Sequence, residues 1–478
     1  MPEPARGLWT ARNRTDSLRA MSGSISIPPA SSPLGHARAL LVLGLPIIGS
    51  NLAQVGLHTV DTVMMGWYGV RELAAVVLAA GLFFVLFVVG SGVSYALMGR
   101  VAASLGAGDE TQVRRDTRMA LWLSLGYAAA IQPVLFHSGA LLRLMGQEDD
   151  IADLAQQFLR VSMIGMFPAL TVAVVKSCLS AFERTRVVLA VTLIGVGINI
   201  ALNWVLIFGR YGFPELGLRG AAVSSVVVQL VTAAALVGYA ARQPQMRRFG
   251  LFQRLWRPDW EAARTMARLG VPIGLTALAE SGLFQATALM MGWIGTVPLA
   301  AHGIAMELAM LTFMVHMGLS SAATVRAGRA FGRHDRAALR MGAWVAQALS
   351  LCFGAVVVAA FLLIPGPLVA LFLDPAKPEA PEIMAVGIAL LAVAGLFQLF
   401  DATQVMALGL LRGVQDTRVP MWVAVTCYWG IGLPASYLLG FTFGGGAQGI
   451  WLGLVVGLAC TGLTLIVRFW RGPWCVAR

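Results

Sequence analysis

The sequence has few charged residues and lacks the short motifs of nucleotide-driven pumps and hydrolytic enzymes. Only 12% of its 478 residues are charged and 58% are hydrophobic, whereas soluble proteins carry about 25% charged residues. No GxxxxGK[ST], HExxH or GxSxG motif occurs, and the six histidines show no metal-ligand spacing, which argues against an ATP-driven pump and against an enzyme. The five cysteines contain no CxxC pair and indicate neither a disulfide framework nor a metal site.

Long apolar segments make up most of the chain. Twelve of them are each near the ~20 residues that a helix needs to cross a bilayer. The sequence therefore predicts an all-α membrane protein with twelve transmembrane helices. The predicted spans are residues 38–62, 74–99, 118–138, 154–176, 187–208, 219–241, 266–291, 299–322, 341–364, 383–410, 419–440 and 447–468.

The basic residues predict the orientation of these spans. If both termini are cytoplasmic, 28 of the 35 Lys and Arg residues fall in the tails and loops on that side and five on the other, leaving only Arg160 and Lys176 inside spans. Cytoplasmic loops carry such an excess. We therefore expect a multi-pass protein of the bacterial cytoplasmic (inner) membrane with both termini inside. The net charge of +12 does not indicate nucleic-acid binding, because the arginines lie in short loops between apolar segments.

A segment in the first half of the chain recurs in the second half. Residues Leu43–Trp67 match Leu269–Trp293 without a gap, 226 residues apart. A period of nearly half the chain is typical of transporters built from two repeats, and it predicts two pseudo-symmetric six-helix bundles. Further pairs at the same spacing are Pro46 and Pro272, Gly92 and Gly318, Arg100 and Arg326, and Asp109 and Asp335. The two prolines could allow the first helix of each half to bend.

The duplication and the polar segments predict the domain organisation. Residues 1–36 form a disordered cytoplasmic tail, in which Met21 could be the true start. Residues 37–241 form the N-terminal bundle and residues 265–470 the C-terminal bundle. The basic linker 242–264 joins the bundles, and residues 471–478 form a second cytoplasmic tail. No apolar segment precedes residue 39, which argues against a cleavable signal peptide.

Acidic residues inside the spans are the main candidates for function. A charged residue at a helix centre costs roughly 2.5–3.5 kcal/mol on insertion scales, so its presence there suggests a task. The two copies of the repeat differ at these positions, because Asp61 stands where the second copy has Thr287, and Glu280 stands where the first has Gln54. The four acidic residues well inside spans are Asp61, Glu280, Glu307 and Asp401.

Three helices carry polar side chains on one face, which predicts a shared water-filled cavity. The first has Asn51, Gln54, His58 and Asp61, the seventh Thr276, Glu280 and Thr287, and the tenth Gln398, Asp401 and Gln404 or Val405. The candidate cavity-lining residues are Gln54, His58, Asn199, Asn203, Thr276, Gln398 and Glu307. Structural roles remain open: Lys176 could pair with a membrane aspartate, Asn199 and Asn203 could serve packing, and Glu307 has no polar stripe around it.

Three long segments resemble the multidrug and toxic compound extrusion (MATE) antiporters. They are VDTVMMGWYGVRELAA (60–75), NIALNWVLIFGRYGFPELGLRGAA (199–222) and LFQLFDATQVMALGLLRGVQDTRVP (396–420). The likeness extends over about residues 38–468, and it is nearest to the NorM-type branch, because Asp61, Glu280 and Asp401 lie on helices one, seven and ten. One departure is Glu307, where the family usually has Asn after Ala-Ala-His. An extra carboxyl there could change the ion preference or stoichiometry.

The resemblance implies a MATE/MOP-type fold and a secondary antiporter. It implies that Glu280 and Asp401 bind the coupling cation, as metal ligands if the ion is Na⁺ and as proton carriers if it is H⁺. It implies that Asp61 acts in coupling or drug binding. We then expect small-molecule drugs, often lipophilic cations, and membrane lipids as partners, no other cofactor, and a monomer. Two alternatives remain: a lipid-linked oligosaccharide or polysaccharide precursor flippase of the same superfamily, and a polytopic membrane enzyme.

Overall fold

The computed structural model of the chain describes residues 32–375 and 377–475, which contain helices and no strand. The predicted tail and the alternative start at Met21 lie almost entirely outside these residues. The N-terminal half contains α2 (Pro33–Tyr68), α3 (Val70–Ala107), α4 (Glu110–Ala130), α5 (Gln132–Phe136), α6 (Ser138–Leu144), α7 (Asp149–Ser162), η1 (Met163–Gly165), α8 (Met166–Ala181), α9 (Thr185–Phe208), α10 (Gly217–Arg242) and α11 (Pro244–Arg247).

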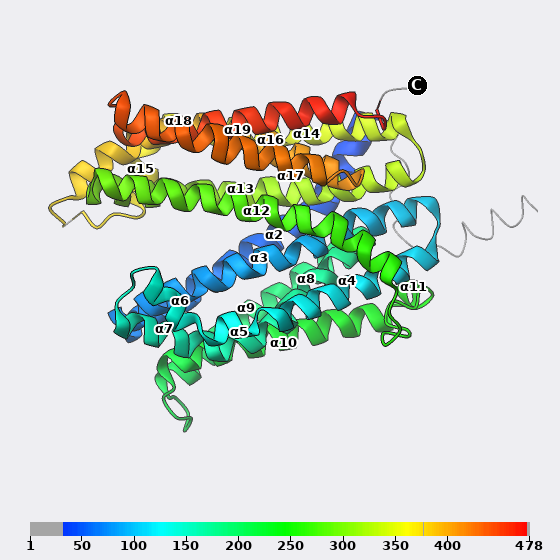
Figure 1. Cartoon of the computed structure of the whole chain (residues 1–478), viewed down its shortest axis with the longest axis horizontal. Helices are drawn as coiled ribbons and strands as arrows, with labels where there is room; N and C mark the ends of the chain where they lie inside the picture. The colour runs from blue at the N-terminus through cyan, green and yellow to red at the C-terminus, as the bar shows by residue number, and fades with distance from the viewer. Residues whose placement is uncertain (1–31, 376, 476–478) are drawn as a thin grey trace, which may run out of the picture.

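The C-terminal half repeats this arrangement, and twelve helical segments of the described chain are long and apolar enough to cross a membrane. The predicted fold class and number of spans are therefore confirmed. Figure 1 shows the two halves as separate bundles that lie one above the other. The second half contains α12 (Trp260–Ile294), α13 (Thr296–Gly332), α14 (Arg336–Leu363), α15 (Pro365–Ala370), α16 (Ala380–Gly413), α17 (Arg418–Val425), η2 (Thr426–Gly432), α18 (Leu433–Tyr437), η3 (Leu438–Thr442) and α19 (Gly446–Arg471).

Several helices begin earlier than the sequence pattern predicts, and polar caps extend the first helix of each half. Ser32 accepts a hydrogen bond from the Gly35 amide at 3.2 Å and Pro33 follows at the first helical position, so α2 starts within the predicted tail. Asp259 accepts from the Ala262 amide at 3.1 Å, so α12 starts at Trp260, inside the predicted linker. Hydrophobicity alone misses such starts, since the first turns are polar.

The prolines in the first helix of each half lie in matching surroundings. Both α2 and α12 continue through their proline. The Ser50 hydroxyl donates to the Pro46 carbonyl at 2.8 Å, and the Thr276 hydroxyl donates to the Pro272 carbonyl at 2.8 Å. The repeat of 226 residues therefore extends to individual side-chain hydrogen bonds. Bending at these prolines stays a prediction.

The eleventh span departs from regular α-helix. The π-helical segments η2 and η3 interrupt it on either side of α18. Pro434 has no amide to donate within this span, and the span packs closely on α19, where a Cβ on Gly432 would lie 3.1 Å from the Gly457 Cα. Hydrophobicity predicts the span but contains no sign of the wider turns.

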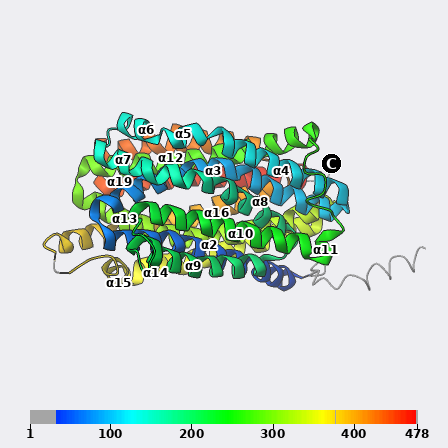
Figure 2. The ribbon, with the colours of Figure 1, turned by 90° about the horizontal axis from the view of Figure 1, so that it is seen from below.

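The start of α2, the start of α14 and the end of α19 lie together at one end of the molecule. The start of α2 lies against α14, since His36 is 3.4 Å from a Cβ built on Gly342, and α14 contacts the end of α19 through Trp344 and Trp470, whose rings are 5.4 Å apart. Figure 2 shows α11 and the chain's C-terminus at this same end. We call it the basic end. It is the end at which the loops with most of the arginines lie.

Small residues bring the two halves together in the part of the molecule nearer the basic end. A Cβ on Gly92 of α3 would lie 2.5 Å from the Gly270 carbonyl of α12, and one on Gly106 would lie 2.3 Å from the Arg329 carbonyl of α13. Only glycine permits such approaches. Toward the opposite end the two bundles diverge (Figure 1).

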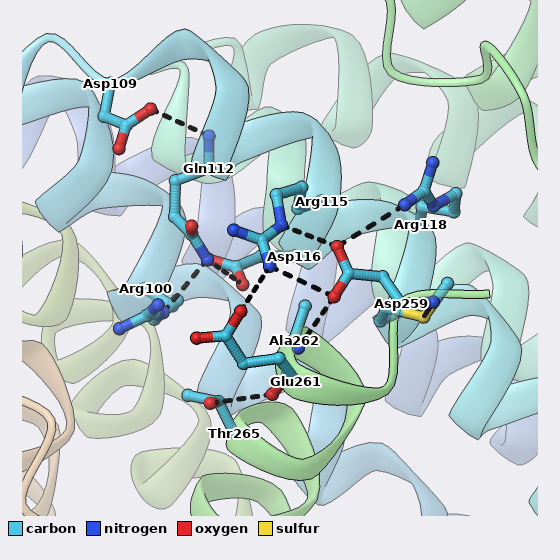
Figure 3. A network of polar contacts seen from close by, with 11 residues as sticks. Arg100, Asp109, Gln112, Arg115, Asp116, Arg118, Asp259, Glu261, Ala262 and Thr265 are labelled. Carbon is cyan, nitrogen blue, oxygen red and sulfur yellow. Dashed lines mark hydrogen bonds and ion pairs between the residues drawn. The ribbon is translucent and has the colours of Figure 1, made fainter. Parts of the chain in front are cut away.

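A polar network at the basic end ties the start of α12 to the N-terminal half (Figure 3). Arg115 of α4 donates to Asp259 at 2.5 Å and to Glu261 at 2.8 Å, and Arg118 lies 3.6 Å from Asp259. Because Arg115 donates to it, the pKa of the Asp259 carboxyl lies below its ordinary value. The network anchors the linker between the halves on α4.

Candidate functional site

A buried carboxylate in the N-terminal half is surrounded by hydrogen-bond donors. Asp61 of α2 is 9% exposed. Its Oδ1 accepts from the Asn199 amide at 3.0 Å and from the Asn203 amide at 2.6 Å, and its Oδ2 accepts from the Ser225 hydroxyl at 3.2 Å. We call these four residues the Asp61 cluster. Three hydrogen-bond donors reduce the cost of burying this carboxyl group.

The cluster is built from three helices of one half. Asn199 and Asn203 are four residues apart on α9 and therefore share a face, and both are fully buried. The Asn203 amide also donates to the Asn199 Oδ1 at 3.3 Å. Ser225 comes from α10, which packs against α9. The donors thus hold one another in place as well as the aspartate.

The remaining polar residues predicted on the first helix lie apart from this cluster. The Lys176 ammonium of α8 donates to the Asn51 Oδ1 at 3.1 Å and is half-buried. Lys176 therefore pairs with an amide rather than with a membrane aspartate. Gln54 is half-buried and His58 is exposed. His58 interacts with Asp61 through charge, and no hydrogen bond joins their side chains in the described residues.

The C-terminal half contains a second polar cluster with different bonding. The Gln404 amide of α16 donates to the Glu280 Oε1 of α12 at 2.9 Å. Asp401, one turn earlier on α16, is 2% exposed, and its Oδ2 has no hydrogen-bond partner in the described residues. Both amide atoms of Gln398 and the Tyr428 hydroxyl are likewise buried and unpartnered. We call these five residues the Glu280–Asp401 cluster.

Two carboxyl groups meet in the Glu280–Asp401 cluster. Gln404, which donates to Glu280, lies one turn after Asp401 on α16, so both carboxyl groups face the same buried region. Unpartnered polar atoms in a protein interior cost free energy unless a ligand completes them. Carboxylate, amide and hydroxyl oxygens are the ligands that hard cations prefer. Nothing in the described residues gathers three His, Cys, Asp or Glu side chains, as a tight resident metal site would.

Two further predicted residues, besides Gln54 and His58, lie outside both clusters. Thr276 is buried, but its hydroxyl is used within its own helix by the bond to Pro272. Glu307 of α13 is exposed and has no hydrogen bond or ion pair with any described residue. The structure therefore does not bring Glu307 into contact with Glu280 or Asp401.

Comparison with known proteins identifies the fold and its family. The MatE profile matches residues 46–205 and 272–438, one segment in each half of the chain. The chain belongs to the MatE family. The "Probable multidrug resistance protein NorM" of Rhizobium meliloti (strain 1021) is 44% identical over 91% of this chain and 93% of its own length. A protein of the same name from Agrobacterium fabrum is 42% identical, covering 94% and 97% of the two chains.

The fold is also that of solved MATE transporters. The eukaryotic MATE transporter AtDTX14 superposes with a TM-score of 0.82 at 20% identity, over 93% of this chain and 97% of that one. As a MatE family member the protein is a multi-pass membrane transporter and not an enzyme. Sequence reasoning missed Ser225 and Tyr428 in its polar clusters, because neither residue stands out in its apolar span.

Proposed function

We propose that this transporter exports lipophilic, often cationic compounds in exchange for inward Na⁺ or H⁺. The observation that supports this most directly is the contrast between the clusters. The Glu280–Asp401 cluster has two carboxyl groups and several buried oxygens without partners, which suits an exchangeable cation. The Asp61 cluster has a single carboxyl group held by three hydrogen-bond donors, which suits a positively charged substrate. The names of the relatives, multidrug resistance proteins, agree with this substrate class.

The proposed cycle exchanges the two cargoes by moving the bundles. With both termini cytoplasmic, the basic end faces the cytoplasm and the diverging end faces outward, as the excess of basic residues supports. A cation entering from outside binds between Glu280 and Asp401, and substrate leaves the Asp61 side. The bundles then rock so that the basic end opens, the cation is released inside and a new substrate binds.

The driving force is sufficient for a multidrug exporter. Moving one elementary charge across ~100 mV supplies about 2.3 kcal/mol. Since about 1.4 kcal/mol corresponds to a factor of ten, one coupled ion supports a gradient of roughly fiftyfold for an uncharged substrate. A monovalent cationic substrate moves out against the same potential, so its export to that gradient requires two coupled ions. No nucleotide site is required for gradients of this size.

The flippase alternative would require a positively charged cavity for a pyrophosphate-linked lipid. Both polar clusters described above centre on carboxyl groups, and Lys176 is paired with Asn51. The chemistry of the described spans therefore favours cationic cargo over anionic lipid-linked sugars.

The test is efflux of ethidium from drug-sensitive bacterial cells that express the protein. Wild type is compared with Glu280→Gln and Asp401→Asn at equal membrane expression, each with and without Na⁺ at fixed pH. We expect export by wild type and loss of export in both variants, and Na⁺ dependence of the wild type identifies the ion. Normal export by both variants would show that these carboxyl groups are structural and would refute the proposal.

A further inference from the structure

Two turns at the basic end have the same geometry and each reaches across to the opposite half. One turn joins α8 to α9 around Glu183, and the other joins α16 to α17 around Gln415. From their contacts we infer that the turns form a paired lock, which holds the basic end shut and must release both contacts before that end can open. The inference rests on the proposed function in one respect only, which is that opening of the basic end is a step of transport.

The two turns repeat each other in sequence and in backbone bonding. Each continues with Thr-Arg-Val, at residues 185–187 and 417–419. The Glu183 amide donates to the Ser180 carbonyl, and the Gln415 amide donates to the Arg412 carbonyl, each three residues back. In both turns the following amide donates five residues back at 2.9 Å. The backbone therefore presents the side chains of residues 183 and 415 in the same way.

Each of these side chains meets an arginine of the other half. The Glu183 Oε1 lies 2.9 Å from the Arg329 Nη1 of α13, and the Arg329 Nη2 donates to the Ala181 carbonyl at 2.8 Å. In the other turn, the Arg100 Nη1 of α3 donates to the Gln415 Oε1 at 3.0 Å. α3 and α13 are equivalent helices of the duplication. The repeat aligns Arg100 with Arg326, three residues before Arg329, so the two contacts join equivalent helices through different positions. One contact is charged where the other has a neutral acceptor.

Arg100 is held by a residue of its own half, and Arg329 is largely shielded from water. Arg100 is fixed by Asp116 of α4, since its Nε donates to the Asp116 Oδ2 at 3.0 Å and the Asp116 side chain is fully buried. The side chains of Arg329 and Glu183 are only 21% and 10% exposed. Ion pairs with so little exposure are weakly screened, and removing one partner leaves the other charge uncompensated. Separation of the halves would break both contacts together.

The backbone of each turn is one that glycine adopts without strain. Glu183 and Gln415 have φ values of 61° and 64°, in the left-handed region that glycine adopts without penalty and other residues do not. Glycine would therefore suit either turn, and replacement by glycine removes the side chain without straining the backbone.

This backbone permits a test in which the fold is not weakened. Glu183→Gly and Gln415→Gly relieve the turn while removing the lock. His334→Gly is the matched control, because His334 also has a positive φ of 56° at the basic end and its exposed side chain has no contact with the other half. Spin labels at Arg186→Cys and Arg336→Cys, both exposed and in opposite halves, report the separation of the basic end. The exposed Cys352 and half-buried Cys460 are replaced by alanine.

Wild type and His334→Gly should give one short label distance in liposomes. Each glycine variant at the lock should raise the population of a second, longer distance by about tenfold, a usual size for such coupling. The pair Arg329→Glu with Glu183→Arg should return the short distance that Arg329→Glu alone loses. Distances in Glu183→Gly and Gln415→Gly that match the His334→Gly control would overturn the lock. These label distances are measured without substrate, so they test the lock independently of transport. If the glycine variants shift the distance but wild type exports no drug, the proposed function is refuted and the lock is supported.

Discussion

Asp61 in the N-terminal half and Asp401 in the C-terminal half are buried aspartates on membrane-spanning helices, yet their neighbours differ. Asp61 accepts three hydrogen bonds from amide and hydroxyl groups. Asp401 has an oxygen without any donor among the described residues, and Gln404, one turn later on the same helix, bonds the second carboxyl group, Glu280. Three donors satisfy the oxygens of one carboxyl group, whereas two carboxyl groups short of donors favour a bound cation.

The difference teaches that one duplicated scaffold can hold two kinds of acidic site. The helices that carry Asp61 and Glu280 are equivalent in the repeat, and both contain a proline with a hydroxyl bond one turn later. What separates the sites is the supply of donors from the packed helices. α9 and α10 present two asparagines and a serine, while α16 presents glutamines whose acceptor oxygens are left over.

The largest effect is expected when the cation site is broken. In liposomes with an imposed ion gradient and ~100 mV potential, Asp401→Asn should lower the substrate accumulation ratio about fiftyfold for each coupled ion lost. The measurement is accumulation of a fluorescent cation inside inverted vesicles. Thr312→Ala on α13, whose hydroxyl bonds only carbonyls of its own helix, serves as control and should retain most accumulation. An unchanged ratio in Asp401→Asn would remove the proposed distinction between the clusters.

The next effect concerns the anion site. Asp61→Asn keeps a side chain of the same size but removes the charge, so the KM for a cationic substrate should rise about tenfold, or about 1.4 kcal/mol. The KM for an uncharged substrate and the ion concentration for half-maximal transport should stay near the wild-type values. Both are measured in initial-rate efflux assays. If the ion dependence shifts instead, Asp61 belongs to the coupling site and the proposed difference between the two clusters is wrong.

Gln404 allows a finer test of the cation site. Its amide holds Glu280 at 2.9 Å while its own Oε1 is buried and unpartnered. If the transport assays identify Na⁺ as the coupling ion, Gln404→Leu should raise the half-saturating Na⁺ concentration about fivefold, because one oxygen ligand and the positioning of Glu280 are lost. Thr403→Ala is the neighbouring control, since the Thr403 hydroxyl is bonded to its own helix at the Leu399 carbonyl. Equal effects of both variants would point to general loosening of α16.

The smallest effect is expected at Glu307. Because this carboxyl is exposed and has no partner in the described residues, Glu307→Gln should change substrate KM and ion half-saturation by less than about twofold. Rates are compared over a range of Na⁺ concentrations and pH. A tenfold change in ion half-saturation would add Glu307 to the cation site and sharpen the difference between the halves further.

Much of the fold was predictable because its signals are local or repeated. Apolar segments define the twelve spans, and the match of Leu43–Trp67 to Leu269–Trp293 predicts the two bundles. Helical spacing also places Asn199 and Asn203 on one face. Their pairing with Asp61, about 140 residues away, depends on how helices pack, which periodicity within one helix does not contain.

The unpredicted parts depend on single side chains and on irregular backbone. Ser225 lies in an apolar span where serine is unremarkable, and Tyr428 is placed in the Glu280–Asp401 cluster by the π-helical segment η2. The partners of Glu183 and Gln415 come from the other half of the chain. In each case the deciding interaction is tertiary, so the residue type alone carries little information.

The hydrogen bonds of the Asp61 cluster join α2, α9 and α10, and the hydrogen bond to Glu280 comes from α16. The residues of each cluster therefore all belong to one half of the chain. This separation bears on how such a protein evolves. If the substrate binds on the Asp61 side and the ion on the Glu280–Asp401 side, as we propose, mutations in one copy of the repeat can widen or narrow the range of compounds accepted, while the other copy remains under selection for its use of the ion gradient. Resistance to a new compound would then arise in one half of the gene without a change in its energy source.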